Sequence, residues 1–446
     1  MNLYPHQIAV LKATESNNRV AYYLDMGLGK TFVGAEKLHR LGTRLNLVVC
    51  QKSKINDWVD HFKQNYSDLN VFDLTNHIEF EAFLDAVNTS EGNIIGCVNY
   101  ELLWRRKRLS ALNNFTLLLD ESSLIQNDKA KQTKCIMKLD AENVILLSGT
   151  PVSGKYENLW TQAKLLGWEI PKRTYENQYI NYKLVDFGTG TKVRTVNKKH
   201  PYKNVERLKR KLREHGAVFM KTEEVMNLPE QTFITVNVDC TNAYKKFMKN
   251  DYIMINPSDG SEFVDESDYM GTDVRPRIEL IATTSLNKRL YSRQLSSLFN
   301  MNKQTALIDL IKSTNDRLIV FYNFNAELEM LKGICGALKR PVSEVNGNCK
   351  DLYAYDNFDC SITLVQYQAG AMGINLQKAN KIIYFSLPER SELFEQSKKR
   401  IHRIGQSKPC FYYLLIAENT VDEAIYECLQ KRKDFTDELF KEVGNG

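Results

Sequence analysis

The sequence predicts an α/β protein with two parallel-sheet domains joined by a middle region of different pattern. Three observations support this prediction. Short apolar runs alternate with helical patterns up to about residue 165, the same alternation returns after about residue 300, and the stretch between lacks it. The apolar runs show no strict polar alternation, which is typical of strands covered on both faces. Strands separated by helices indicate βαβ units. We therefore expect domains at 1–165 and 301–446, with helical protrusions and a linker at 166–300.

Each expected element follows from a local pattern. The apolar runs that predict strands of the first domain are 20–24, 45–50, 93–98, 116–120 and 144–148. Those of the last domain are 317–322, 362–365, 381–385 and 410–415. In the middle region, 207–213 has the pattern of a basic amphipathic helix and 232–238 alternates like a half-buried strand. The break between them is Leu228-Pro229-Glu230-Gln231, and 256–273 is rich in Ser, Asp, Gly and Pro, which favours a loop.

Composition excludes several classes of protein. The 446 residues are 43% hydrophobic and 26% charged, a balance typical of globular proteins and not of disordered ones. No apolar run approaches the roughly 20 residues that cross a membrane. The N-terminus lacks the pattern of a secretory signal. Nine scattered cysteines indicate reduced thiols and a cytoplasmic location. Trp58 and Trp160 are interpreted as packing residues.

The strongest local signal is the segment Asp25-Met26-Gly27-Leu28-Gly29-Lys30-Thr31. It lies between an apolar strand and a helical pattern, where a glycine-rich turn directs backbone N–H groups at phosphates. Gly27, Leu28 and Gly29 would supply these N–H groups. Lys30 would reach the β- and γ-phosphates, and the Thr31 hydroxyl would coordinate Mg²⁺. A chance Gly-Lys-Thr turn is the alternative, and the strand–loop–helix context disfavours it, although Leu24 stands where the general pattern has its first glycine.

A second signal is the pair Asp120-Glu121, which follows the apolar run 116–119. Acidic pairs are common on solvated surfaces, but a pair at the end of a buried strand is the usual companion of a phosphate loop. One carboxylate then organises Mg²⁺ and the next orients or deprotonates the attacking water. We therefore predict Thr31 and Asp120 as metal ligands and Glu121 as the residue that activates water.

Further signals lie at Ser148-Gly149-Thr150-Pro151, which follows a strand, and in the basic segment 396–406. Arg400 and Arg403 are three residues apart and would share one helix face. A solvated basic helix is the alternative. Arginines presented by a second domain to a γ-phosphate are worth about 10³–10⁵ in rate. The candidate catalytic set is Lys30, Asp120, Glu121, Arg400 and Arg403.

These segments, in their order and spacing, resemble the superfamily 2 helicase-type ATPases of the Swi/Snf-related DNA translocase group. The matching segments are His6-Gln7, 25–31 (motif I), 48–58 (Ia), 98–103 (Ib), 120–127 (II), 148–151 (III), 321–324 (IV), 368–376 (V) and 396–406 (VI). The Asp-Glu-Ser start of motif II resembles the annealing-helicase (HARP-like) branch. Ser123 stands where the group usually has histidine, and Gln51 replaces a common proline.

The resemblance implies two tandem RecA-like (P-loop) lobes that use ATP and Mg²⁺. It also implies that Gln7 reads adenine and that Gly373 and Gln396 help to bind the nucleotide. The DNA contacts that it implies are Lys52, Ser53, Tyr100, Asn323 and Gln368. Such contacts recognise the backbone and carry no sequence information.

A basic band at 192–213 adds a charge argument. The chain carries a net charge of only +6, but this band holds ten lysines and arginines against Glu206 alone. A balanced solvated face does not explain that excess, so phosphate contact is the favoured interpretation.

We therefore expect a DNA-dependent ATPase that moves along or remodels duplex or forked DNA in repair, replication or recombination. The short remainder after the motor segments favours a compact bacterial or bacteriophage form. The expected location is the cytoplasm, or the nucleus if the source is eukaryotic. A recruiting protein is a possible partner. Two alternatives stay open: a strand-separating helicase and a non-catalytic DNA-binding clamp.

Overall fold

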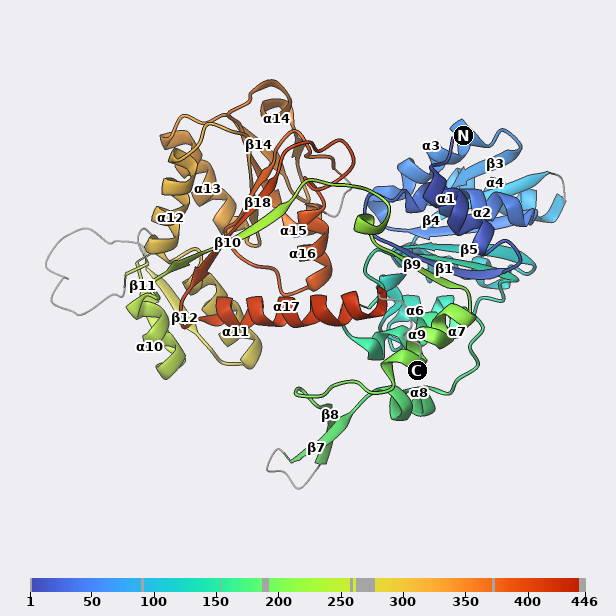
Figure 1. Cartoon of the computed structure of the whole chain (residues 1–446), viewed down its shortest axis with the longest axis horizontal. Helices are drawn as coiled ribbons and strands as arrows, with labels where there is room; N and C mark the ends of the chain where they lie inside the picture. Colours follow the sequence, from blue (N-terminus) through green and yellow to red (C-terminus); the bar gives the residue numbers. More distant parts are fainter. Residues whose placement is uncertain are drawn as a thin grey trace, which may run out of the picture. The chain divides into compact units, whose positions relative to one another are not determined.

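The structure is a computed structural model. It describes residues 2–89, 92–152, 154–186, 192–256, 260–261, 277–370 and 374–440, with the side chains of 369–370 and 434–440 excepted. The chain divides into two compact units, shown in Figure 1. Unit 1 is Met1–Met226 with Arg432–Gly446, and unit 2 is Asn227–Lys431. No helix in the described ranges is long and apolar enough to cross a membrane.

Unit 1 contains a seven-stranded sheet in the order β3-β4-β2-β5-β6-β1-β9. Every neighbouring pair in it is parallel. Its strands are β1 (Arg19–Leu24), β2 (Leu45–Cys50), β3 (Leu69–Asp73), β4 (Asn93–Asn99), β5 (Phe115–Asp120), β6 (Asn143–Leu147) and β9 (Ala217–Met220). The carboxyl ends of β5, β6 and β1 are therefore neighbours along one edge, which is where α/β sheets bind ligands.

Helices connect the strands of unit 1. They are α1 (Pro5–Ala13), α2 (Lys30–Leu41), α3 (Ile55–Asn65), α4 (His77–Thr89), α5 (Tyr100–Leu103), α6 (Lys131–Ile136), α7 (Trp160–Leu165), α8 (Lys172–Tyr179) and α9 (Val205–Glu214). Short 3₁₀ turns are η1 (Lys52–Lys54), η2 (Lys107–Ala111), η3 (Ser122–Ile125), η4 (Tyr156–Leu159) and η5 (Thr222–Glu224). A separate antiparallel hairpin consists of β7 (Tyr182–Asp186) and β8 (Lys192–Val196).

The sheet of unit 1 is buried on both faces. Along β1, Ala21 and Tyr23 belong to one apolar cluster, whereas Val20, Tyr22 and Leu24 belong to another. Successive side chains of a strand point to opposite faces, so the two clusters are the two sides of the sheet. This double coverage explains why the strands appear in the sequence as continuous apolar runs.

Unit 2 contains a second seven-stranded sheet in the order β10-β18-β17-β13-β16-β14-β15. The strands are β10 (Gln231–Val238), β13 (Leu318–Tyr322), β14 (Val342–Val345), β15 (Lys350–Asp351), β16 (Ile362–Gln366), β17 (Lys381–Tyr384) and β18 (Cys410–Ala417). Only the edge pair β14–β15 is antiparallel within this sheet. The predicted α/β class with two parallel sheets is confirmed.

The helices of unit 2 complete the fold. They are α10 (Asn242–Asn250), α11 (Ser285–Ser296), α12 (Met301–Lys312), α13 (Asn325–Ala337), α14 (Tyr353–Asn357), α15 (Tyr367–Gly370), α16 (Ser391–Lys398) and α17 (Val421–Phe440), whose last residues belong to unit 1. A small cluster forms around α10, α11 and the antiparallel pair β11 (Tyr252–Ile255) and β12 (Ile278–Ile281).

The middle region divides between the two units. Strand β9 pairs with β1 in unit 1, and β10 pairs with β18 in unit 2. The contacts thus divide the middle region after Met226, whereas the sequence suggested a separate stretch at 166–300. The predicted basic helix is present as α9 and the predicted alternating strand as β10. Most of the predicted loop at 256–273 lies outside the described residues.

Candidate active site

The phosphate-loop segment connects β1 to α2, as predicted. Gly27 and Gly29 have φ angles of 90° and 76°, a backbone region that favours glycine. The amide of Val33 donates to the Gly29 carbonyl, so the helix begins at once after the loop. A side chain at Gly29 would also overlap the amide nitrogen of Gln7. Both requirements explain the Gly-x-Gly spacing.

Gln7 holds this loop in place. Its side chain is 3% exposed, its Nε2 donates to the Leu28 carbonyl at 3.1 Å, and its Oε1 accepts from the Tyr4 amide at 2.9 Å. The His6 ring also donates to the Leu28 carbonyl, at 3.1 Å. Both ends of the Gln7 amide group are therefore engaged with the protein. That Gln7 reads adenine stays a prediction.

The ammonium group of Lys30, the first residue of α2, lies at the carboxyl end of β1. Its Nζ donates to the Leu24 carbonyl at 3.1 Å. The same nitrogen lies 3.2 Å from the position that a Cβ on Gly149 would occupy. The structure therefore brings the lysine of motif I against the turn of motif III, and glycine at 149 leaves room for it.

Asp120 ends β5, and its carboxylate accepts a hydrogen bond from the Trp58 indole at 2.9 Å. Burial raises the pKa of Asp120, while the Trp58 bond and the charges of Lys30 and Lys54 lower it. Lys30 and Asp120 thus influence each other electrostatically. The interpretation of Trp58 as a packing residue is confirmed, because it is buried and stacks on Phe62 of α3. Its indole has a second role that the sequence did not reveal, since it also orients a site carboxylate.

Glu121 has φ 53° and ψ 57°, a left-handed conformation that is uncommon for a residue with a side chain. The Tyr100 hydroxyl donates to the neighbouring Asp120 carbonyl at 2.7 Å and helps to hold this backbone. Such strain is typically found at functional sites. Tyr100 itself is only 1% exposed, so its predicted role as a DNA contact was wrong: the side chain points into the core under motif II.

The other predicted contacts in unit 1 are exposed. Lys52 and Ser53 form part of η1, directly after β2, and both are accessible to solvent. Their position at the carboxyl edge of the sheet permits contact with a ligand. Their role in DNA binding stays a prediction.

In unit 2, Asn323 follows β13, and Gln368 lies in α15 after β16 and is exposed. The Asn323 amide nitrogen donates to the Ser386 hydroxyl at 2.8 Å and to the Leu387 carbonyl at 3.1 Å. Buried Glu327 accepts from the backbone amide of Asn323 at 2.8 Å. The structure therefore engages Asn323 in holding motif IV, which leaves its backbone-binding role a prediction.

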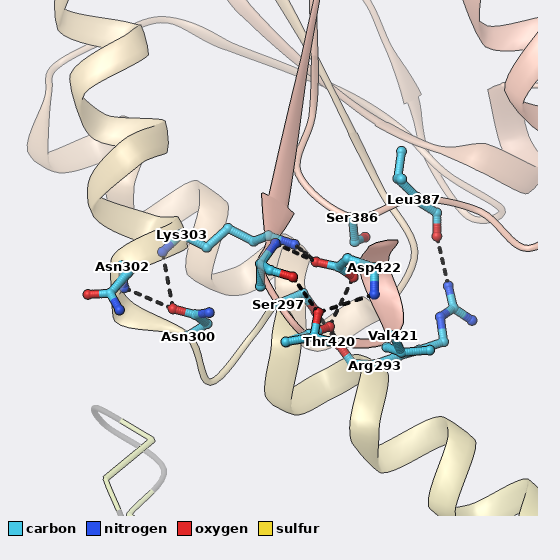
Figure 2. A network of polar contacts seen from close by, with 12 residues as sticks. Arg293, Ser297, Asn300, Asn302, Lys303, Ser386, Leu387, Thr420, Val421 and Asp422 are labelled. Atoms are coloured by element: carbon cyan, nitrogen blue, oxygen red, sulfur yellow. Dashed lines mark hydrogen bonds and ion pairs between the residues drawn. The ribbon is translucent and has the colours of Figure 1, made fainter. Parts of the chain in front are cut away.

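A buried polar network supports this edge of unit 2, as Figure 2 shows. The Lys303 ammonium lies 2.5 Å from the Asp422 carboxylate, and both residues are almost fully buried. Ser296 donates to Asp422 at 3.0 Å, and its neighbour Ser297 donates to Glu327 at 2.6 Å. Adjacent serines at the end of α11 thus connect the start of α17 to motif IV.

Arg400 and Arg403 lie beyond α16, which ends at Lys398. The prediction that they share a helix face was wrong, because the Arg400 carbonyl accepts from the Leu376 amide at 3.1 Å and the chain turns away. Both side chains nevertheless turn to motif V: Arg400 donates to the Ile374 carbonyl at 3.5 Å, and Arg403 donates to the Asn375 side chain. Desolvation lowers the pKa of Arg403. Gln396 is buried in α16, and Gly373 lies outside the described residues.

Comparison with known proteins identifies the family. The model of the SNF2-related domain matches residues 14–300, and the helicase conserved C-terminal domain matches residues 302–405. The chain belongs to the SNF2-related family.

Curated relatives of this SNF2-related chain come from distant organisms. The mouse SWI/SNF-related matrix-associated actin-dependent regulator of chromatin subfamily A member 1 is 25% identical over 90% of this chain and 40% of the relative. The putative ATP-dependent helicase/translocase YwqA of Bacillus subtilis is 22% identical over 94% of this chain and 46% of the relative. The chain therefore spans less than half the length of these two relatives. The solved Sulfolobus solfataricus SWI2/SNF2 ATPase core in complex with dsDNA is 19% identical over 98% of this chain and 92% of that chain, with a TM-score of 0.45.

The sequence did not reveal Gln162 of α7, which connects three parts of the SNF2-related site. Its Oε1 accepts from the Ser122 hydroxyl at 2.8 Å and from the Tyr23 hydroxyl at 3.0 Å. Its Nε2 donates to the Pro151 carbonyl at 2.7 Å. Fully buried Gln162 therefore ties motif II, motif III and β1 together. No sequence signal marks it, because a single polar residue in a short helix carries no pattern.

A second link that the sequence did not reveal joins the phosphate loop to η5. The Thr222 hydroxyl donates to the Asp25 carboxylate at 2.9 Å, and the other oxygen of Asp25 accepts from the Met26 amide at 2.8 Å. Thr222 is buried at the end of unit 1, four residues before Met226. The loop is thereby fixed to the segment that leaves the unit.

The residues present fit a Mg²⁺ ion bound with a nucleotide. Asp120 offers a carboxylate, and in the described ranges the Thr31 hydroxyl has no protein hydrogen-bond partner. No cluster of three or more His, Cys, Asp or Glu suited to a metal occurs among the described residues. Mg²⁺ usually binds through one or two protein oxygens together with substrate phosphates, and Asp120 and Thr31 would supply the protein oxygens.

Proposed function

We propose that this SNF2-related chain is an ATP-dependent DNA translocase, which hydrolyses ATP to move along or remodel duplex or forked DNA. One observation supports the catalytic part above the others: Lys30 lies against Gly149 and within electrostatic reach of Asp120, so motifs I, II and III converge at one edge of the sheet of unit 1. That convergence provides a cation for phosphate and a carboxylate for Mg²⁺ in one place.

The residues divide the chemistry as follows. Backbone N–H groups from Gly27 to Gly29 and the Lys30 ammonium bind the phosphates, and Thr31 with Asp120 would hold Mg²⁺. The ion supplies neutralisation of the charge that develops on the phosphates. Glu121 orients the attacking water.

Residues of unit 2 complete the proposed site. Arg400 and Arg403 stabilise the charge on the γ-phosphate in the transition state, and Gly373 and Gln396 contribute to nucleotide binding. The DNA backbone is bound by Lys52, Ser53, Asn323 and Gln368. A curated relative that carries the words helicase/translocase in its name supports this class of activity. Repair, replication and recombination are the processes in which we place it.

The test is the ATPase rate of the full chain with duplex, single-stranded and forked DNA and with RNA. Duplex or forked DNA should stimulate the wild type, and Glu121→Gln should abolish turnover while nucleotide binding persists. Absence of DNA stimulation in folded protein would favour a DNA-binding clamp, and stimulation by RNA alone would contradict a DNA motor.

A second measurement separates translocation from strand separation. A translocase displaces the third strand of a triplex but leaves a plain duplex intact. Unwinding of the plain duplex would identify a strand-separating helicase.

A further inference from the structure

The hairpin β7–β8 and the segment 197–204 that follows it form a feature of unit 1, here called the basic arm. Among the described residues, β7 and β8 pair only with each other and do not join the seven-stranded sheet. It extends away from α8 and α9, the helices that flank it in the chain (Figure 1). In the range 182–204 the only acidic residue is Asp186.

The structure separates the basic band at 192–213 into two groups. In α9, Lys209 is 1% exposed and ion-paired to Glu206 at 2.8 Å, and Lys211 is ion-paired to Glu214 at 2.6 Å. The Arg213 guanidinium lies 4.7 Å from the centre of the Phe219 ring. These three cations are engaged within unit 1, so the charge density in the sequence overstates the positive charge that α9 offers to a partner.

The lysines of the arm are different. They are all exposed, and within the described ranges none forms an ion pair with a carboxylate, although exposed Asp186 is the register partner of Lys192. The five lysines are Lys183, Lys192, Lys198, Lys199 and Lys203. Exposed cations normally lie near exposed anions, and a cluster without them repels itself. A polyanion that releases its counterions on binding is the partner that such a cluster favours.

The arm is firmly attached at its base. Tyr182, Val196 and Tyr202 pack against the apolar core of unit 1. Tyr202 stacks on Tyr156 at 4.3 Å, and its hydroxyl donates to Glu157 at 3.1 Å. The lysines are therefore carried on a structured support. A cluster held at a fixed place loses less conformational entropy on binding than one on a free chain.

Arg194 stiffens the hairpin itself. Its guanidinium lies 3.9 Å from the centre of the Tyr182 ring across the strand pair, and it donates to Asn177 of α8 at 2.8 Å. This arginine is thus engaged within unit 1, and the five lysines remain the free charges of the arm.

We propose that the basic arm binds the phosphate backbone of duplex DNA, as a contact additional to the sheet edges. This inference rests on the proposed function and names a surface that the family motifs do not include. The arm would hold DNA without reading sequence, since lysines contact phosphate as point charges. Because the arm lies outside the nucleotide-binding motifs, its loss should weaken DNA binding and leave DNA-independent ATP hydrolysis unchanged.

The test uses the full chain with Lys192, Lys198, Lys199 and Lys203 all changed to Ala. Binding to a fluorescent duplex is measured over a range of KCl concentrations. Each lost phosphate contact lowers the slope of log affinity against log salt by about 0.9, so the slope should fall by about 3 to 4. The ATPase rate without DNA should match the wild type, and the DNA concentration for half-stimulation should rise more than tenfold.

The matched control changes Lys12, Lys63, Lys134 and Lys138 to Ala, which removes four equally exposed charges from helices of unit 1 and from the turn after α6. Its slope should stay near that of the wild type. An unchanged slope in the arm variant, or an equal fall in the control, would contradict the proposal that the basic arm binds duplex DNA. If DNA stimulates ATP hydrolysis by the wild type and the arm variant behaves identically, the proposed function stands and the proposed DNA contact of the arm is rejected. A wild type that does not bind duplex DNA would reject both.

Discussion

Asp120 experiences opposing influences on a single carboxyl group. Burial raises the pKa of Asp120, whereas the indole N–H of Trp58 and the ammonium of Lys30 stabilise the carboxylate and lower the pKa. A metal binds the carboxylate and not the protonated acid. The balance between burial and hydrogen bonding therefore sets the pH above which the proposed site can hold Mg²⁺.

Trp58→Phe should shift that balance. The change removes a hydrogen bond to a charged acceptor, worth about 1.5–3 kcal/mol, and so raises the pKa of Asp120 further. The carboxylate then forms only at higher pH, so the acid limb of the ATPase profile should move upward, with a rate loss of roughly tenfold or more at acidic pH and a smaller loss at alkaline pH. The measurement is kcat/KM for MgATP against pH.

Trp160→Phe is the control, because its indole donates to the Ile170 carbonyl at 2.9 Å and not to a site carboxylate. Its profile should keep the acid limb of the wild type. Parallel profiles for the two variants would show that Trp58 contributes packing alone.

At the residue scale, sequence reasoning located groups by their place after strands but could not tell their direction. Lys30 follows β1 and Asp120 ends β5, and the two converge because these parallel strands, with β6 between them, end at the same edge of the sheet. Tyr100 also follows a strand, yet its side chain enters the core. Gln162 was missed because its three partners come from distant segments, and only the folded chain brings them together.

At the element scale, the central strands of the unit 1 sheet were predictable from the sequence, whereas its two edge strands, β3 and β9, were not. β2, β5 and β6 are buried on both faces, so they stand out as continuous apolar runs. β9 is a four-residue edge strand with one fully buried position, and β3 has none. Edge strands depend on pairing partners that are distant in sequence, so their local pattern is weak.

The link between η5 and the phosphate loop gives a prediction for an element. Thr222→Val keeps the side-chain volume but removes the hydroxyl that binds the Asp25 carboxylate. A bond to a charged group is worth about 1.5–3 kcal/mol, so a loosened loop should raise the KM for ATP roughly tenfold. Steady-state kinetics of the full chain measure this value.

Thr133→Val is the matched control, because Thr133 is also buried and its hydroxyl has no hydrogen-bond partner in the described structure. That variant should bind ATP like the wild type and be no less stable. A KM for ATP that does not change in Thr222→Val would contradict a role for η5 in holding the loop.

The buried ion pair between α12 and α17 gives a second prediction for elements. Lys303→Met leaves the Asp422 carboxylate buried without its cation, which typically costs about 3–5 kcal/mol. Hydrogen exchange of unit 2 amides should report this loss, whereas amides of unit 1 should keep their protection. Lys381→Met removes a pair whose Asp316 partner is 57% exposed, and it should cost only about 0–1 kcal/mol. Equal losses in the two variants would contradict the importance of burial.

At the scale of the whole molecule, each unit has its own apolar clusters around its own parallel sheet. The sequence predicted two such sheets from the return of the βαβ pattern. It did not place the division at Met226, although the Leu228-Pro229 break lies directly after it. Strands β9 and β10 on either side of this break each pair with a strand that is distant in sequence, and that pairing assigns them to different units.

The proposed action of unit 2 on ATP bound by unit 1 leads to a prediction for the whole chain. In the Glu121→Gln background, which should bind ATP without turnover, MgATP should slow hydrogen exchange at 25–31 and 120–125 and also at 400–406. Adding Arg403→Ala should abolish protection at 400–406 and keep it in unit 1, because only the contact to the γ-phosphate is lost. Arg289→Ala, which removes an exposed cation from the same unit, should change neither. In the protein that keeps the natural Glu121, Arg403→Ala should lower the ATPase rate about 10³-fold or more. Protection confined to unit 1 in the parent protein would contradict arginine contact from unit 2.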